Sequence, residues 1–256
     1  MQWDQDKVFD NAAIYDLAFS WDLTEEIDFF KTVLGNSRRN LLIPACGTGR
    51  YAYRMGLENF HVTAFDLHAK MLAFALSYRR HPNIHYLLED MTDMNAIQKN
   101  FYEGGLLLNN SFRYILEREK AVQHLQNVSG VLENGGLYLI EMGLNEARQH
   151  KNATTSWVTQ RDDAEVTSRW TLEEWNPPYA LDRVEIRLKT PTEEIKITEK
   201  QPQLTWTFCN ILDAIRQTRM TLKMIYDAKR NPINNWTTIQ NECGKYYLLL
   251  ENKNAL

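Results

Sequence analysis

The feature that most constrains the fold of this chain is a regular alternation of short apolar runs with helical stretches between residues 41 and 141. Each apolar run suits a strand buried on both faces, and most of the intervening segments suit a crossover helix. This alternation predicts an α/β fold with a doubly wound, mostly parallel sheet of seven strands. In this region we expect strands at 41–44, 60–65, 84–88, 105–109 and 137–141, and helices at 50–58, 69–79, 95–102 and 117–132.

Beyond residue 150 the pattern changes to a period of two, which is typical of half-buried antiparallel strands. This pattern predicts a small antiparallel β-sheet inserted into the main fold, after which a helix and two strands return to it. The inserted strands are expected at 156–158, 165–175, 183–188, 195–198 and 204–206, and the returning elements at 208–216, 221–226 and 245–250.

The first 40 residues read as two helical stretches, at 9–19 and from Thr24 to Gly35. We therefore expect a chain of three parts. These are an N-terminal helical cap at 1–40, a Rossmann-like domain at 41–150 and 208–256, and an inserted β subdomain at 151–207.

Composition narrows the classes of partner. The net charge is −4 and there is no extended basic stripe, so a nucleic-acid partner is not expected. No apolar run approaches the length of a membrane span, and the polar N-terminus lacks the apolar core of a signal peptide. The three cysteines are Cys46, Cys209 and Cys243, whose wide spacing fits neither a disulfide framework nor a metal site. We expect a cytoplasmic protein with a small-molecule substrate and no metal.

The loop from Ala45 to Arg50 follows the first expected strand and precedes a helix. Its glycines, Gly47 and Gly49, allow close approach of the backbone to a ligand, and the helix N-terminus offers free N–H groups to an anionic group. A Gly-x-Gly pair alone is weak evidence, because most such pairs are plain turns.

Two acidic residues follow the next two expected strands. Asp66 is placed to accept hydrogen bonds from ribose hydroxyls, although a helix-capping role is the alternative. Asp90, followed by Met91, is placed to accept from an adenine amino group while Met91 packs on the ring. Since ligands of doubly wound sheets lie at the carboxyl ends of the strands, the loop and both acids are expected in one site.

Together these segments resemble the class I S-adenosylmethionine-dependent methyltransferases, over about residues 10–145 and 208–251. The resemblance implies S-adenosylmethionine as cofactor. It implies these cofactor-binding residues: Tyr15, Ala45, Cys46, Gly47, Thr48, Gly49, Asp66, Leu67, Met71, Asp90, Met91 and Asn109. Asn110, Ser111 and Glu141 are candidates for contact with the substrate, and Tyr15 and Glu141 are the candidate catalytic residues.

A looser resemblance is to methyltransferases of small molecules, such as sugar N-methyltransferases and glycine N-methyltransferase. It rests on residues 14–19 and on the inserted sheet. The resemblance implies methyl transfer to nitrogen or oxygen of a small molecule, with the inserted sheet covering the substrate or forming a homodimer. The family's usual acid before the loop is replaced by Ile43, which keeps open a non-catalytic relative that binds a partner through the insertion.

An NAD(P)-dependent oxidoreductase is the other alternative, because residues 47–52 also fit the dinucleotide-binding pattern. The sequence Asn-Pro-Pro-Tyr at 176–179 matches a motif of N-methyltransferases that act on adenine or glutamine, but it lies in the insertion, where a turn is the better interpretation. His124 is expected to be solvated on the surface of its helix.

Overall fold

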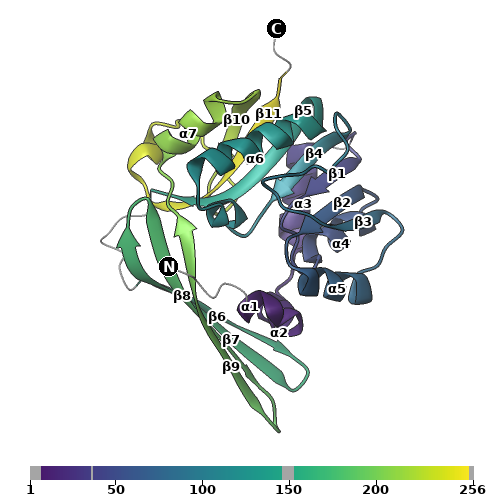
Figure 1. Cartoon of the computed structure of the whole chain (residues 1–256), viewed down its shortest axis with the longest axis vertical. Coiled ribbons are helices and arrows are strands. Elements are labelled where there is room, and N and C mark those ends of the chain that lie inside the picture. The colour runs from purple at the N-terminus through teal and green to yellow at the C-terminus, as the bar shows by residue number, and fades with distance from the viewer. Residues whose placement is uncertain (1–6, 36, 146–152, 254–256) are drawn as a thin grey trace.

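The computed structural model describes residues 7–35, 37–145 and 153–253. The strands in these ranges form two separate sheets (Figure 1). The larger sheet has the strand order β10-β11-β5-β4-β1-β2-β3. Its strands are β1 (Asn40–Ile43), β2 (His61–Asp66), β3 (Ile84–Leu88), β4 (Tyr102–Leu107), β5 (Leu132–Leu144), β10 (Met220–Tyr226) and β11 (Gly244–Asn252). The first five are parallel, and β11 runs antiparallel to both β5 and β10. The predicted seven-stranded, mostly parallel sheet is confirmed.

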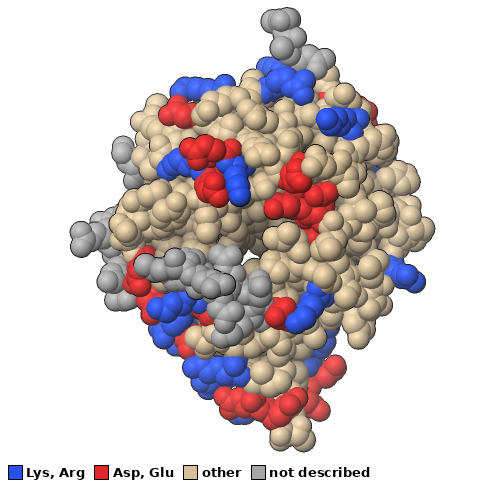
Figure 2. Space-filling model, in the orientation of Figure 1, with Lys and Arg blue, Asp and Glu red and all other residues tan. Residues whose placement is uncertain are grey.

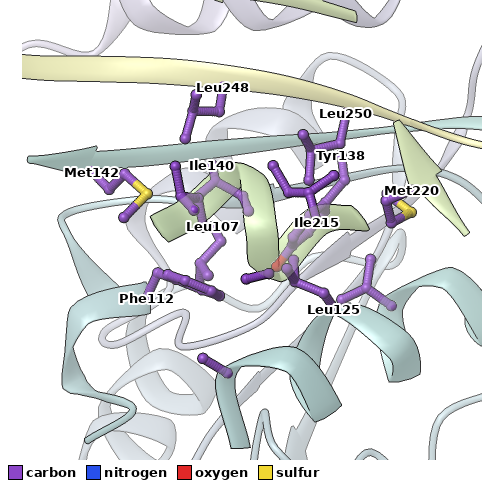
Figure 3. Close-up of a cluster of buried hydrophobic side chains, with 14 of the residues drawn as sticks. Leu107, Phe112, Leu125, Tyr138, Ile140, Met142, Ile215, Met220, Leu248 and Leu250 are labelled. Atoms are coloured by element: carbon purple, nitrogen blue, oxygen red, sulfur yellow. The ribbon is translucent and has the colours of Figure 1, made fainter. Parts of the chain in front are cut away.

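Helices cover both faces of this sheet. On one face, α6 (Arg118–Val131) and α7 (Phe208–Arg216) pack on alternate residues of the central strands. Figure 3 shows Leu125 of α6 and Ile215 of α7 lying beneath side chains of β4, β5 and β11, such as Ile140. On the other face, α3 (Thr24–Leu34) and α4 (Arg50–Leu57) bury a second apolar cluster. The helix α5 (Ala69–Tyr78) packs on β2 and β3.

The smaller sheet is the antiparallel series β6 (Thr154–Arg161), β7 (Ala164–Asn176), β8 (Tyr179–Lys189) and β9 (Glu194–Leu204). The two strands expected at 195–198 and 204–206 are replaced by the single strand β9. Asn176 ends β7 and Tyr179 begins β8, so the Asn-Pro-Pro-Tyr segment is a hairpin turn, as interpreted from the sequence. The expected boundary at residue 150 lies outside the described residues.

The helical stretch expected at 9–19 is divided at Asn11 into α1 (Lys7–Asp10) and α2 (Ala12–Ala18). Both lie between the smaller sheet and α5 (Figure 1). The cap was expected to begin at residue 1, and residues 1–6 lie outside the described part. Within 7–35, 37–145 and 153–253, no helix has the length and apolar character needed to cross a membrane.

The helix expected at 95–102 is wrong, because these residues form turns that lead directly into β4. Polar side chains hold the backbone in a non-helical path: Glu89 accepts from the N–H of Ala96, and Asn95 donates to Asp93. Asn100 takes a φ of 49°, which a helix does not allow. Short polar side chains compete in this way with helical hydrogen bonds.

Candidate active site

The strand order of the larger sheet reverses between β1 and β4, because the chain leaves β1 toward β2 and returns to the other side at β4. A cavity of about 880 Å³ opens at the carboxyl ends of these strands. It is lined by residues of both sheets and of α1 and α2. Cavities of roughly 300–1,000 Å³ hold small ligands, and doubly wound sheets bind them at this switch point.

The loop between β1 and α4 curls back onto the end of β2. The N–H of Cys46 donates to the carbonyl of Phe65 at 3.0 Å, and the N–H of Gly47 donates to Asp66 Oδ2 at 2.8 Å. Gly47 and Gly49 take φ values of 55° and 79°, in the left-handed region that favours glycine. The loop therefore fixes the Asp66 carboxylate against its own backbone.

Asp66 accepts a hydrogen bond in the turn into α5 and also lies at the cavity, where its contact with ribose hydroxyls stays a prediction. Its Oδ1 accepts from the N–H of His68 at 2.9 Å, so the carboxylate organises the turn into α5, whose N-cap position is His68 itself. Asp66 also lines the cavity and is only 7% exposed. His68 Nδ1 also lies 3.1 Å from Oδ1, so that oxygen has two partners. Oδ2 accepts from Gly47 and keeps a lone pair for a ligand.

The turn after β3 brings Asp90 and Met91 to the same cavity. Asp90 Oδ1 accepts from the N–H and the hydroxyl of Thr92, at 2.7 and 2.8 Å, whereas Oδ2 makes no hydrogen bond within the described ranges. The carbonyl of Met91 is 2.7 Å from His124 Nδ1. This turn is therefore held from both sides, with one carboxylate oxygen left for a ligand.

His124 is fully buried, so the expectation that it is solvated is wrong. A carbonyl only accepts hydrogen bonds, so Nδ1 carries the proton donated to Met91, and Nε2 accepts from the Tyr138 hydroxyl at 3.0 Å. Burial lowers the pKa of His124 from 6.5 to about 4, against the opposing effect of the bond to Met91. The side chain is a neutral support of the turn after β3.

The cap is fastened to the glycine loop by the buried carboxylate of Asp16 on α2. Its Oδ1 accepts from the Thr48 hydroxyl at 2.8 Å and lies 2.6 Å from Nη1 of Arg79, which follows α5. The neighbouring Tyr15 stacks on Phe19, with ring centroids 4.3 Å apart. Burial raises the pKa of the Tyr15 hydroxyl above its usual value, and the charge of Asp66 adds to this effect.

The end of β5 contributes a buried carboxylate, Glu141, which is 4% exposed and lines the cavity. Its Oε1 is 2.9 Å from Lys245 Nζ on β11, and its Oε2 accepts from the N–H of Asn109 at 3.2 Å. Burial lowers the pKa of the Lys245 ammonium group, but the charges of Glu141 and Tyr247 and the hydrogen bonds to them together outweigh burial, and the net pKa is raised. Lys245 is therefore a cation at neutral pH.

The side chains of two candidate substrate residues form hydrogen bonds with the backbone. Asn110 Oδ1 accepts from the N–H of Gly143 at 2.6 Å, and the Ser111 hydroxyl donates to the carbonyl of Leu108 at 2.7 Å. Both residues line the cavity. Their hydrogen bonds give them a part in shaping the turn after β4.

The predicted cofactor residues are brought together around one cavity, with two exceptions. Gly49 and Met71 do not line it: Gly49 faces Tyr86 and Ala75, and Met71 is buried on α5. Sequence reasoning missed the wall formed by the smaller sheet and the segment after β4, including Arg113, Tyr114, Asp182, Gln201 and Gln203.

No group of three or more His, Cys, Asp or Glu side chains within 7–35, 37–145 and 153–253 is arranged to hold a metal ion. Ile43, where the resembled family has an acid, is 3% exposed and packs among the apolar residues beneath α3 and α4. Its side chain extends the apolar cluster up to the cavity wall.

Comparison with known proteins agrees with this geometry. Residues 42–136 match the family of the methyltransferase domain. A putative methyltransferase from Geobacillus sp. (strain WCH70) is 23% identical over 146 residues, which cover 56% of this chain and 58% of that protein. The chain therefore matches somewhat more than half the length of that relative.

Solved structures share the fold over nearly the whole chain. An S-adenosylmethionine-dependent methyltransferase from Clostridium acetobutylicum has a TM-score of 0.76 at 15% identity, covering 94% of this chain and 97% of its own. The S-adenosylmethionine-bound amino pentose methyltransferase CalS10 from Micromonospora echinaspora has a TM-score of 0.68 at 14% identity, covering 96% and 92%.

The strand order, the loop after β1 and the domain match define a protein of the class I methyltransferase fold. The match to the methyltransferase domain is confined to residues 42–136, and two solved structures of this fold are an S-adenosylmethionine-dependent and an S-adenosylmethionine-bound methyltransferase.

Proposed function

We propose that this protein transfers a methyl group from S-adenosylmethionine to nitrogen or oxygen of a small molecule. The observation that carries the proposal is the convergence of Asp66, Asp90 and the turn after β4 on one cavity, each at the end of a different parallel strand. A dinucleotide site requires the loop and the first acid, whereas the second acid adds an acceptor suited to an adenine amino group.

The residues present fit this cofactor. Asp66 Oδ2 keeps a lone pair for a ribose hydroxyl, and Asp90 Oδ2 is available to an amino group. The left-handed turn at Gly47 leaves space toward Tyr15, since a Cβ at Gly47 would lie 3.7 Å from the Tyr15 ring. When bound, S-adenosylmethionine supplies an electrophilic methyl group on a sulfonium centre.

The enclosure of the cavity supports a small methyl acceptor. The smaller sheet and the helices α1 and α2 face the carboxyl ends of the larger sheet, so an acceptor in the cavity is in contact with the protein on both sides (Figure 1). Exclusion of water and alignment of the reacting atoms are the main contributions that a protein makes to such a displacement. The amino pentose methyltransferase shares this arrangement in its fold.

Of the two candidate catalytic residues, Glu141 is the better placed to handle a proton. Tyr15 stays a neutral hydroxyl at physiological pH because its pKa is raised by burial, and this leaves it a packing and hydrogen-bonding role. The Glu141 carboxylate is held by Lys245 and by the N–H of Asn109 at the cavity wall. In our proposal it accepts a hydrogen bond from the acceptor amine or hydroxyl and orients its lone pair.

Calorimetric titration with S-adenosylhomocysteine and with NAD tests the proposal. We expect S-adenosylhomocysteine to bind with micromolar or tighter affinity and NAD not to bind. Binding of NAD alone would replace the proposal with an oxidoreductase. Binding of neither would favour a non-catalytic protein that uses the smaller sheet for a partner, as the replacement of the usual acid by Ile43 allows.

The location in the cytoplasm and a homodimer through the smaller sheet are further parts of this proposal. Ion pairs on that sheet join Lys196 of β9 to Glu185 of the neighbouring β8, and Lys200 of β9 to Glu173 of β7 across β8. On the face shown in Figure 2, basic and acidic side chains are interspersed, which agrees with a partner other than nucleic acid. Sedimentation of the purified protein measures its oligomeric state.

A further inference from the structure

One face of β9 carries three buried polar side chains at alternate positions. Glu199, Gln201 and Gln203 are 5%, 2% and 4% exposed, and Gln201 and Gln203 line the cavity. Successive side chains of a strand point to opposite faces, so these three share the face turned toward the larger sheet. Since burial of a polar group is costly unless it is hydrogen-bonded, each of the three needs a partner.

The first two have their partners within the protein. Glu199 Oε2 accepts from the N–H of Val8 at 2.7 Å, and its Oε1 accepts from the Gln201 amide. Gln201 Oε1 in turn accepts from the Tyr114 hydroxyl at 2.7 Å. These bonds join β9 to the cap and to the segment after β4, which gives Glu199 and Gln201 a structural role.

Gln203 differs from its neighbours because half of its amide is unpartnered. Its Nε2 donates to Asp182 Oδ2 at 3.0 Å. A carboxylate only accepts, so this bond fixes which end of the amide faces Asp182. The other end, Oε1, is buried and accepts no hydrogen bond in the described part of the chain. A buried acceptor in this state is one that a ligand N–H or O–H would satisfy.

The same face of the smaller sheet also carries an apolar part of the cavity wall, level with Glu199 and Gln201 in the strand register. In the strand register Asp182 lies opposite both Gln201 of β9 and Leu172 of β7, and Trp170 shares the face of Leu172. Trp170 and Leu172 line the same cavity as Gln203. An apolar and aromatic surface on the same cavity wall as a fixed acceptor suits a ring that has C–H groups on its face and hydroxyl or amino groups at its edge.

Gln203 lies on the sheet opposite the one that carries Asp66 and Asp90. A molecule that contacts Gln203 is therefore the methyl acceptor, and the contact lies away from the cofactor residues. We propose that Gln203, held by Asp182, is a specificity-determining residue. It binds a hydroxyl or amino group of the acceptor and thereby selects small polyhydroxylated amines. This inference rests on the proposed function.

The test uses methyl β-D-glucosaminide as the probe and the complex of the protein with S-adenosylhomocysteine as the receptor. Binding is measured by calorimetry or ligand-observed NMR in the wild type, in Gln203→Met, and in Gln160→Met. Gln160 is an exposed amide of β6 and gives a matched control. We expect Gln203→Met to weaken binding of the probe at least tenfold, and Gln160→Met to leave it unchanged. Both variants should bind S-adenosylhomocysteine as the wild type does.

A second arm needs no variant. The wild type should bind one of two analogues at least tenfold more weakly than the probe itself. These are the tri-O-methyl ether of the probe, which has lost the hydroxyl donors but keeps the amine, and methyl β-D-glucoside. Methyl β-D-glucoside, which lacks the amine, shows whether the recognised donor is a hydroxyl or the amino group. This arm keeps the inference testable if Gln203→Met folds poorly.

The inference is overturned if Gln203→Met binds the probe as the wild type does. It is also overturned if a wild type that binds S-adenosylhomocysteine binds none of the three probes. A wild type that does not bind S-adenosylhomocysteine overturns the proposed function first and the inference with it, so the two failures are distinguishable.

Discussion

The carboxylates in and around the cavity differ in how far their partners balance their negative charge. Asp66 accepts two backbone N–H groups, which hold its position without neutralising its charge. Asp16 is neutralised by Arg79 and fastens the cap. Glu141 combines the two situations, with Lys245 on one oxygen and a backbone N–H on the other. Of these three carboxylates, Asp66 is the one that lines the cavity without a lysine or arginine partner, so its loss should affect ligand affinity more than the loss of Asp16 or Glu141.

Replacement of Asp66 by alanine removes both acceptor oxygens at the end of β2. We expect Asp66→Ala to weaken binding of S-adenosylhomocysteine by about 10- to 100-fold, because a hydrogen bond to a charged group contributes roughly 1.5–3 kcal/mol. Calorimetry measures the change. Asp213→Ala, on an exposed side chain of α7, is the matched control and should leave the affinity unaltered. Equal affinities for Asp66→Ala and the wild type would contradict the ribose role.

At Gly49, a side chain would collide with Tyr86, and the left-handed backbone conformation also favours glycine. A Cβ at Gly49 would lie 2.6 Å from the Tyr86 hydroxyl, and its φ is 79°. Gly135 has a φ of 78° and nothing within 4 Å of such a Cβ. Gly135→Ala should therefore cost about 1 kcal/mol of unfolding free energy from backbone strain alone, and Gly49→Ala about 2–4 kcal/mol. Denaturant unfolding compares them, and equal losses would exclude a steric contribution from Tyr86.

Among the elements, α2 is the one that ties the cap to the cofactor side of the cavity. It contacts β6 and β7 of the smaller sheet and also α5 of the larger domain. Its buried Asp16 reaches both the glycine loop, through Thr48, and the end of α5, through Arg79. The same Arg79 guanidinium donates to the carbonyl of Thr48 at 2.7 Å, which closes the cluster. Loosening of α2 should therefore disturb the loop as well.

Asp16→Asn removes the charge that balances Arg79 at a site where the carboxylate is 3% exposed. Since breaking a buried ion pair leaves an uncompensated charge, we expect a loss of about 3 kcal/mol in unfolding free energy. Weaker binding of S-adenosylhomocysteine should accompany this loss. Asp28→Asn, at an exposed pair with Lys31, should change stability by less than about 0.5 kcal/mol. A variant as stable as this control would show that Asp16 does not fasten the cap.

The strands of the larger sheet were predictable because each is a compact apolar run next to turn residues. The segment 95–102 was mispredicted because Ile97 and Phe101 have the i, i+4 spacing of a helix, while the hydrogen bonds that prevent the helix come from Glu89 and Asp93 outside it. The strand β9 was split in two at its centre, where Gln201 and Gln203 interrupt the apolar pattern. Their burial depends on partners in other elements, which local periodicity does not reveal.

At the scale of the whole molecule, the cavity lies between two walls, and only one of them could be predicted in detail from the sequence. The cofactor side follows from local order, because Asp66 and Asp90 stand directly after their strands. The acceptor side depends on the register of the smaller sheet, which sets Asp182 beside Gln201 and Gln203 on a face turned to the cavity. The alternation of Glu199, Gln201 and Gln203 is the signal that could have marked this wall.

The buried His124 predicts how the stability of the whole molecule depends on pH. Its pKa is about 4 in the folded protein and 6.5 by reference, so between these values the unfolded chain binds more protons. The unfolding free energy therefore falls as the pH is lowered from 6.5 to 4, by about 3 kcal/mol from this residue. His124→Gln should be less stable than the wild type at pH 7, and the difference should shrink by a similar amount by pH 4. Chemical denaturation at several pH values measures this convergence. NMR of the ring should show no titration of His124 between pH 7 and 5, and a midpoint near 6.5 would contradict the buried neutral tautomer.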